Sequence, residues 1–364
     1  MSAHVAWLMT PPAPYRLTNK DCFSIAVVAE RWLASGGEDD VAYLWDNQVS
    51  DSVPVLKIDH EDSVIQVAFN NAQTLLSTGD MSGKIIVTQL SDLNTRAKIN
   101  DCNDLGWMCW HNTSDILFAG DKDGIIWMWL IGPGGVAQAK VYSGNGSPCT
   151  SGDLLPDGKR LLAGYADGVV RLWCLKEGTY AMVTFSAAIT ALHHHVSQPI
   201  GVVGTENGSV HLLNTSQTDK LTIVLEFSAL SEPRGEDKME ELVVETSVEC
   251  LQFAPFNSWL AVGRNDGTLC IYETTSSTPR STYTSPSSQA IVRALWSMEG
   301  NIPFLCAGSV DGFIRIFDGR DGSLYKELGN GPDEVLDMVL LGSNPLRIMT
   351  AGGGGAIRIF NVLL

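Results

Sequence analysis

The chain has 364 residues, 45% of them hydrophobic and 18% charged, and its 41 acidic and 24 basic side chains give a formal net charge of −17. A surface this acidic argues against nucleic acid or an anionic membrane as a direct partner and favours a basic one, unless the charge serves only solubility. No apolar run approaches the ~20 residues that a membrane helix needs, and the eight cysteines form no Cys-x-x-Cys pair, so we expect reduced thiols in the cytosol or the nucleus.

The first clear element is the stretch SGGEDDVAYLWD at 35–46, which is typical of a turn followed by a strand. A tight turn needs one residue whose side chain accepts backbone hydrogen bonds, yet three acids, Glu38, Asp39 and Asp40, follow one another. We expect one of them to shape the turn and the other two to project charge.

The same pattern recurs along the chain: an apolar strand, a glycine, a turn that often ends in Asp-Gly, and an alternating strand. The last residue of the turn falls at 40, 83, 124, 168, 208, 267, 312 and 355, so the spacings are 43, 41, 44, 40, 59, 45 and 43 residues. Another strand-like segment precedes each turn, for example SVIQVAF at 63–69. A period of about 40–45 residues with four short strands per unit is typical of propeller blades. The sequence therefore predicts an all-β, eight-bladed β-propeller.

Eight blades account for nearly the whole length, so we predict one domain over 1–364. The expected blades are 19–48, 49–92, 93–132, 133–178, 179–216, 217–276, 277–320 and 321–364. The last repeat stops after its third strand. We therefore expect residues 12–18 to supply the strand that completes blade eight and closes the ring. A closed ring exposes few strand edges, which favours a monomer.

The one break in the period is the 59-residue spacing between the fifth and sixth turns. The extra material, 228–245, is rich in acidic residues, and we expect a surface loop. It is either a solvated insertion without a role or an acidic lip that contacts a basic partner.

Turns between second and third strands should gather on one rim of the ring, together with the loops that lead into each first strand. Asp39, Asp123, Asp167, Asp266 and Asp311 occupy the structural position of the turn, where we expect them to cap backbone amides. Other acids at this rim have no such duty and could contact a partner, with Trp107 as an apolar anchor unless it packs into the core. The candidate partner-binding residues are Glu38, Asp39, Asp40, Asp62, Asp80, Asp104, Asp121, Asp123, Trp107, Glu206, Asp333 and Glu334.

The sequence shows no motif of an enzyme or a metal site. It lacks a G-x-S-x-G elbow, a P-loop and an H-E-x-x-H pair, and its glycine-rich stretches do not lie between a strand and a helix. The three consecutive histidines, His193, His194 and His195, are expected at the end of a first strand, on a surface turn. We therefore predict a protein without catalytic residues, metal or cofactor.

These repeats resemble the WD-repeat family, although Trp45-Asp46 alone matches its dipeptide and His60 is the best candidate for its histidine. The hydrogen-bonded tetrad that stiffens such blades is expected to be incomplete. The stretches ASGGEDDVAYLWD, DSVIQVAFN, STGDMSGKI, DLGWMCWH and LLPDGKRLLAGYADGVVRLW together are similar to the angio-associated migratory cell protein family.

That resemblance implies a function. The family includes a fungal chaperone that captures the basic N-terminal segment of a large-subunit ribosomal protein on the acidic rim of its propeller and aids ribosome assembly. Residues of this chain that match are Glu38, Asp39, Asp40, Asp80, Asp121 and Asp123. The alternative, drawn from the animal members, is a signalling scaffold that binds folded partners in cell migration and angiogenesis.

Overall fold

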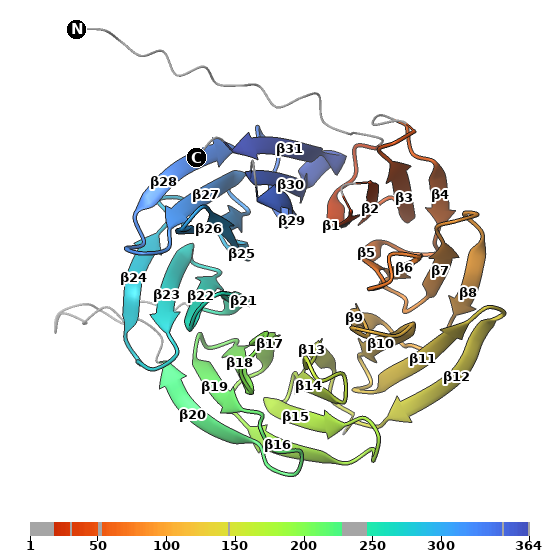
Figure 1. Cartoon of the computed structure of the whole chain (residues 1–364), viewed down its shortest axis with the longest axis horizontal. Coiled ribbons are helices and arrows are strands. Elements are labelled where there is room, and N and C mark those ends of the chain that lie inside the picture. The colour runs from red at the N-terminus through yellow and green to blue at the C-terminus, as the bar shows by residue number, and fades with distance from the viewer. Residues whose placement is uncertain are drawn as a thin grey trace, which may run out of the picture.

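The computed structural model of the chain describes residues 18–29, 31–49, 53–144, 146–227, 246–343 and 346–362. These residues form eight antiparallel sheets, the blades of a propeller, around an open centre (Figure 1). In each blade the strands follow chain order from the first, nearest the centre, to the last, at the outer edge (Figure 1). The predicted all-β, eight-bladed propeller is confirmed.

The first half of the ring contains four four-stranded blades. Blade one has β1 (Cys22–Val28), β2 (Trp32–Gly37), β3 (Val41–Asp46) and β4 (Leu56–Asp59), and blade two has β5 (Val64–Phe69), β6 (Leu75–Asp80), β7 (Ile85–Gln89) and β8 (Thr95–Ile99). Blade three has β9 (Leu105–Trp110), β10 (Ile116–Asp121), β11 (Ile126–Gly132) and β12 (Gly135–Tyr142), and blade four has β13 (Cys149–Leu154), β14 (Arg160–Tyr165), β15 (Val169–Cys174) and β16 (Tyr180–Thr184).

The second half completes the ring. Blade five has β17 (Ile189–His194), β18 (Ile200–Thr205), β19 (Val210–Asn214) and β20 (Thr222–Phe227), and blade six has β21 (Val248–Phe253), β22 (Trp259–Arg264), β23 (Thr268–Glu273) and β24 (Pro279–Thr284). Blade seven has β25 (Ile291–Glu299), β26 (Ile302–Ser309), β27 (Phe313–Asp318) and β28 (Leu324–Gly329), and blade eight has β29 (Val335–Ser343), β30 (Leu346–Gly352), the short 3-10 turn η1 (Gly353–Gly355) and β31 (Ile357–Val362).

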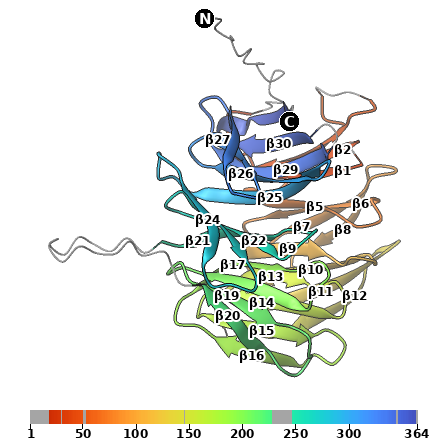
Figure 2. The same ribbon diagram turned by 60° about the vertical axis from the view of Figure 1, so that its left-hand side comes forward.

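Burial along the strands follows from the packing of one sheet against the next. Every residue of the second strand β6 is buried, whereas the outermost strand β28 alternates between exposed and partly buried residues. A second strand lies between two neighbouring sheets and so needs apolar or small side chains on both faces. Figure 2 shows these sheets packing face to face around the ring.

The core is divided into eight apolar clusters, one at each junction between neighbouring blades. At the last junction, Leu33 and Trp45 of blade one pack with Met349 and Ile357 of blade eight. The backbone N–H of Ile25 also donates to Asp337 Oδ2 of blade eight at 3.0 Å. The ring is therefore closed by packing between its first and last blades.

The predicted blade boundaries were wrong by one strand. The range 49–92 assigned residues 56–59 to blade two, but β4 pairs with β3 of blade one. The outermost strands of blades two to seven are displaced in the same way, because each pairs antiparallel with the strand just before it. The chain then crosses to the centre of the ring to begin the next blade.

Two predicted features lie outside the described residues: the insertion at 228–245, and the closing strand at 12–18 except for Thr18, which is in no strand. Blade eight has three strands in the described part of the chain. Among the described residues, no helix is long and apolar enough to cross a membrane.

Candidate functional site: an acidic rim

One face of the ring carries two kinds of segment, which we call the acidic rim. They are the turns between second and third strands and the lead-in loops that precede each first strand. In blade one the N–H of Glu38 donates to the carbonyl of Asp21 at 2.8 Å, and in blade two that of Met81 donates to Ser63 at 2.9 Å. Corresponding backbone bonds join turn and lead-in loop in the other six blades. This repeated bond places all the turns on the same face.

The charge of the rim is concentrated over blades one to three. Their segments, 18–21, 38–40, 60–63, 80–84, 100–104 and 121–124, contain eleven acidic and three basic residues. The corresponding described segments of blades four to six contain three acidic residues and one basic residue.

The three consecutive acids of blade one have different roles. Asp40 adopts a positive φ of 60°, at the position where the other seven blades have glycine. The carboxylate of Asp39 accepts a hydrogen bond from the hydroxyl of Tyr43 at 2.8 Å. Burial, followed by this contact with Asp39, raises the pKa of Tyr43 to about 12. Glu38 is exposed and pairs with Lys20 at 3.2 Å. The turn therefore uses two acids, where one was expected.

Asp80 was predicted to face a partner, and this was wrong. Its carboxylate is fully buried at the end of β6 and accepts hydrogen bonds from the Ser82 hydroxyl at 2.7 Å and the Lys84 N–H at 3.0 Å. His60 Nδ1 lies 2.9 Å from the same carboxylate, and its Nε2 lies 2.8 Å from the Thr78 hydroxyl. Burial by itself raises the pKa of Asp80, but the bonds from His60, Ser82 and Lys84 outweigh it and hold the pKa below its usual range. Asp80 is a structural residue of blade two.

Asp121 occupies the same position in blade three and is also buried, so its predicted contact with a partner was wrong too. It accepts hydrogen bonds from the N–H groups of Asp123 and Ile125, at 3.1 and 2.9 Å, and from the indole N–H of Trp127 at 2.8 Å. Both aspartates end a second strand, three residues before the last residue of the turn. That position in the repeat was the signal that could have identified them as structural.

The predicted apolar anchor, Trp107, is a core residue. Its side chain is buried between blades three and four, where its indole N–H lies 3.2 Å from Cys149 Sγ. A Cβ atom added to Gly120 or Gly152 would lie 2.2 Å from the Trp107 ring, so both glycines leave room for it. Trp107 therefore packs in the core, which is the alternative that the sequence left open.

The remaining predicted acids lie at the rim. Asp62 accepts from the N–H of Ser63 at 2.7 Å, Asp104 pairs with Lys122 at 2.5 Å, and the exposed Asp123 accepts from the Asn103 amide at 2.9 Å. Glu206 and Glu334 are exposed, and in the described part of the chain their side chains form no ion pair. Asp167, Asp266 and Asp311 each accept a bond from the backbone N–H two residues later, which is the expected capping role.

In blades seven and eight, arginines neutralise the acids of the rim. Arg315, the third residue after the turn of blade seven, pairs with Asp311 at 2.8 Å, and Arg358 at the same position of blade eight pairs with Asp333. Blades one and three have Tyr43 and Trp127 at this position, and these donate to a carboxylate without cancelling its charge. Sequence reasoning missed this difference, although the residue type can be read directly once the turns are located.

The Asp311–Arg315 pair predicts a pH dependence of stability. Burial raises the pKa of Asp311, but bonds from Arg315 and Ser287 outweigh it and lower the pKa from 3.8 to about 2. A depressed pKa contributes stability above the unfolded value and loses it as the pH falls toward the folded one. We expect the stability of the native chain relative to Asp311→Asn to shrink by about 2 kcal/mol between pH 4 and pH 2. Urea unfolding of both proteins at pH 4, 3 and 2 measures this difference in stability. A difference that stays constant over this range would contradict the stabilising role of the Asp311–Arg315 pair.

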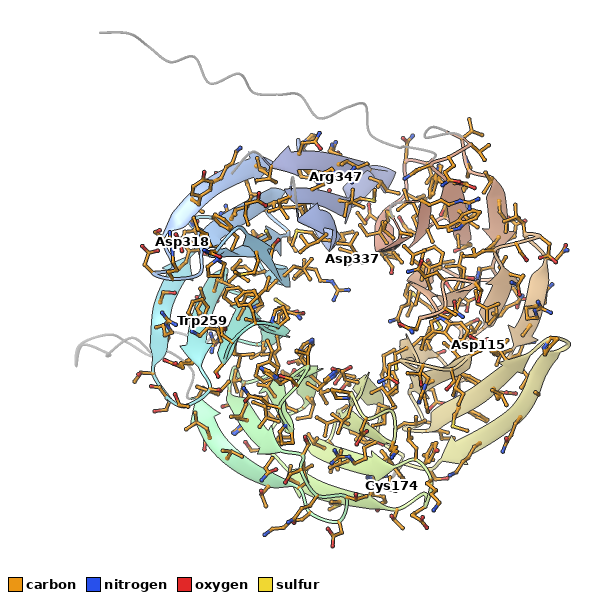
Figure 3. The ribbon with its side chains drawn as sticks, in the orientation of Figure 1. Asp115, Cys174, Trp259, Asp318, Asp337 and Arg347 are labelled. Carbon is orange, nitrogen blue, oxygen red and sulfur yellow. The ribbon has the colours of Figure 1, made fainter. Side chains whose placement is uncertain are left out.

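The central cavity of the ring, about 340 Å³, is lined by first strands. Asp337 lies on its wall (Figure 3) and pairs with Arg293 at 2.6 Å. Arg293 and Asp337 are the third residues of the first strands β25 and β29, so they occupy equivalent positions of neighbouring blades. The three histidines lie at the end of the first strand β17, as expected: His193 and His194 are its last residues, and His194 Nδ1 lies 2.7 Å from Asp153. The expected surface position was wrong for His195, which is buried. Among the described residues, no group of histidine, cysteine and acidic side chains could hold a metal ion.

Comparison with known proteins identifies the family to which this chain belongs. Residues 137–174 and 242–273 match the WD domain, G-beta repeat. The human angio-associated migratory cell protein is 32% identical over 338 residues, which cover 91% of this chain and 75% of that protein. The chain belongs to the angio-associated migratory cell protein family. The resemblance read from the sequence is confirmed.

This member of the angio-associated migratory cell protein family is also similar to a fungal protein. The ribosome assembly protein SQT1 of Saccharomyces cerevisiae is 24% identical over 366 residues, 91% of this chain and 81% of that protein. The solved structure of Sqt1 from the same yeast superposes with a TM-score of 0.83 at 19% identity, covering 97% of this chain and 99% of that one. The structure of Sqt1 from Chaetomium thermophilum bound to the N-terminus of the ribosomal protein L10 superposes with a TM-score of 0.81 at 20% identity, and it also covers 97% of this chain and 99% of that one. These structures share the fold of the family member described here.

Proposed function

We propose that this protein binds the basic segment of a large-subunit ribosomal protein on the part of its acidic rim over blades one to three. The observation that carries the proposal is the excess of nine acidic residues, without the buried Asp80 and Asp121, over three basic residues in the rim segments of these blades. Their carboxylates lie in short turns fixed to neighbouring loops by backbone hydrogen bonds, so the charge has a defined place on the surface.

The arrangement suits a flexible basic peptide better than a folded partner. The turns of neighbouring blades lie in a row, and long lysine and arginine side chains can reach from one to the next. An exposed ion pair contributes only about 0.2–1 kcal/mol, so useful affinity needs many contacts along an extended segment. Covering that segment would shield it from RNA phosphates, which the net charge of −17 repels.

The proposed role is that of a dedicated chaperone, acting in the cytosol and nucleus, without catalysis and without cofactor. It is supported by the relatives: SQT1 is a ribosome assembly protein, and the C. thermophilum Sqt1 has been solved bound to the N-terminus of the ribosomal protein L10. Of the predicted partner-binding residues, we retain Glu38, Asp39, Asp40, Asp62, Asp104 and Asp123, with Glu206 and Glu334 as peripheral contacts. We set aside Asp333, because Arg358 neutralises its charge.

Binding of a synthetic N-terminal segment of the ribosomal protein L10 at different salt concentrations tests this proposal. Raising the salt from about 0.1 to about 1 M shrinks the Debye length from about 10 to about 3 Å. We expect the dissociation constant, measured by titration calorimetry, to rise at least about tenfold. An unchanged constant would contradict the proposal and favour the alternative, a scaffold that binds folded partners through apolar contacts.

A further inference from the structure

A second pocket lies on the opposite face of the ring from the acidic rim. It has a volume of about 420 Å³ and lies between blades three and four. Its residues come from the starts of β10 and β14 and from the end of β15, the strand ends farthest from the turns of the rim. Cys174, at its edge, is labelled on blade four in Figure 3. The wall is apolar, formed by Ile116, Phe118 and Met128 of blade three and by Leu175 of blade four.

The two sides of the pocket are held by hydrogen bonds between the blades. The ammonium group of Lys140 and the hydroxyl of Tyr142, both on β12, donate to the carbonyl of Leu175 at 2.5 and 2.8 Å. On the other side, His111 Nε2 lies 2.9 Å from the carbonyl of Gly158. These contacts bridge the chain on both sides of the apolar wall, so the pocket exists before any ligand arrives.

The edge of the pocket is basic, although the chain as a whole is strongly acidic. Arg160 pairs with Asp157 at 2.7 Å, and the highly exposed Lys176 makes a loose pair with Glu177 at 3.5 Å. Lys159 is exposed and forms no ion pair within the described part of the chain. Together with Lys140, this edge has four basic and two acidic residues.

We propose that this pocket docks a short acidic peptide segment of a partner protein, with one apolar side chain inserted between the blades. A volume of a few hundred Å³ with an apolar wall is typical of a peptide or small-molecule site. A leucine, methionine or phenylalanine side chain would contact the partly exposed Ile116, Met128 and Leu175. Carboxylates on either side of it would lie against Lys159 and Lys176. The charge complementarity selects an acidic segment, whereas the acidic rim selects a basic one.

The two sites can be occupied together, because they lie on opposite faces of the ring. The proposed chaperone could then hold its basic client on one face and be recruited through the other. This inference does not depend on the proposed function: failure at the pocket leaves the acidic rim untouched, and the reverse is also true.

Selection from a phage-displayed library of random seven-residue peptides tests the pocket without knowledge of the partner. The library is panned on the native chain and on the double variant Lys159→Glu/Lys176→Glu. We expect the native chain alone to enrich peptides with several Asp or Glu residues around a central Leu, Met or Phe. An enriched peptide, labelled with a fluorophore, should bind the double variant at least tenfold more weakly in an anisotropy titration.

Two controls make the result specific. The variant Lys57→Glu/Lys98→Glu has the same change in charge on outer strands of blades one and two, and should bind the peptide like the native chain. Replacing the central apolar residue of the peptide by serine should weaken binding at least tenfold. The proposal is overturned if acidic peptides are not enriched, if the pocket variant enriches the same set, or if the serine peptide binds equally well.

Discussion

Reversing three charges of the acidic rim is expected to weaken binding of the basic ribosomal segment about a hundredfold. The variant Glu38→Lys/Glu61→Lys/Asp123→Lys replaces attraction by repulsion at three exposed positions and leaves Lys20 and Lys84 without their partners. With about 0.2–1 kcal/mol for each exposed pair, and a penalty of similar size for each repulsion, the binding free energy changes by about 3 kcal/mol. Titration calorimetry with the synthetic segment at about 0.1 M salt measures it.

The choice of these three residues follows from their exposure. A variant that reverses Asp80 and Asp121, as the sequence alone suggested, would lose binding because blades two and three unfold, and would not test the surface. The matched control is Glu177→Lys/Asp219→Lys/Asp321→Lys, the same change on exposed residues of the opposite face. It should keep native affinity and a native circular dichroism spectrum. Equal weakening in both variants would show that total charge matters and the rim does not.

Removing the buried carboxylate of blade two is expected to destabilise the fold strongly. Asp80→Ala deletes the acceptor of the Ser82 hydroxyl and the Lys84 N–H, and leaves the buried ring of His60 without its partner at Nδ1. Losing one member of a buried charged contact costs about 3–5 kcal/mol. Urea unfolding at pH 7 of the native chain and the variant measures the difference.

The pH dependence and a neighbouring carboxylate provide the controls for this variant. The pKa of Asp80 is lowered in the folded state, so its contribution is present above the unfolded pKa and is lost as the pH falls through the folded one. The difference in the free energy of unfolding between the native chain and Asp80→Ala should therefore become smaller as the pH falls. Asp123→Ala, in the exposed turn of blade three, should lower the free energy of unfolding by no more than about 0.5 kcal/mol. Equal costs for the two substitutions would show that the His60 contact is not structural.

The sequence predicts the ring and its rim well because both depend on the spacing of the turns. A glycine or aspartate that ends a turn every 40–45 residues, with one spacing of 59, determines the blades and places the loops on one face. Burial within the rim is harder to predict: Asp80 and Asp123 both lie near a turn, yet one ends a strand inside the blade and the other is exposed. The contact between Arg293 and Asp337 joins different blades, and nothing local in either strand indicates it.

The hydrogen bond from the hydroxyl of Tyr43 to Asp39 has a consequence for how the rim meets its ligand. Because folding has already fixed this carboxylate, binding does not have to restrict its rotamers again. The entropic cost of association at this position then falls mostly on the peptide, and this part of the rim is preorganised. An arginine in place of Tyr43 would hold the carboxylate equally still but would neutralise its charge. A neutral donor thus combines rigidity with undiminished charge.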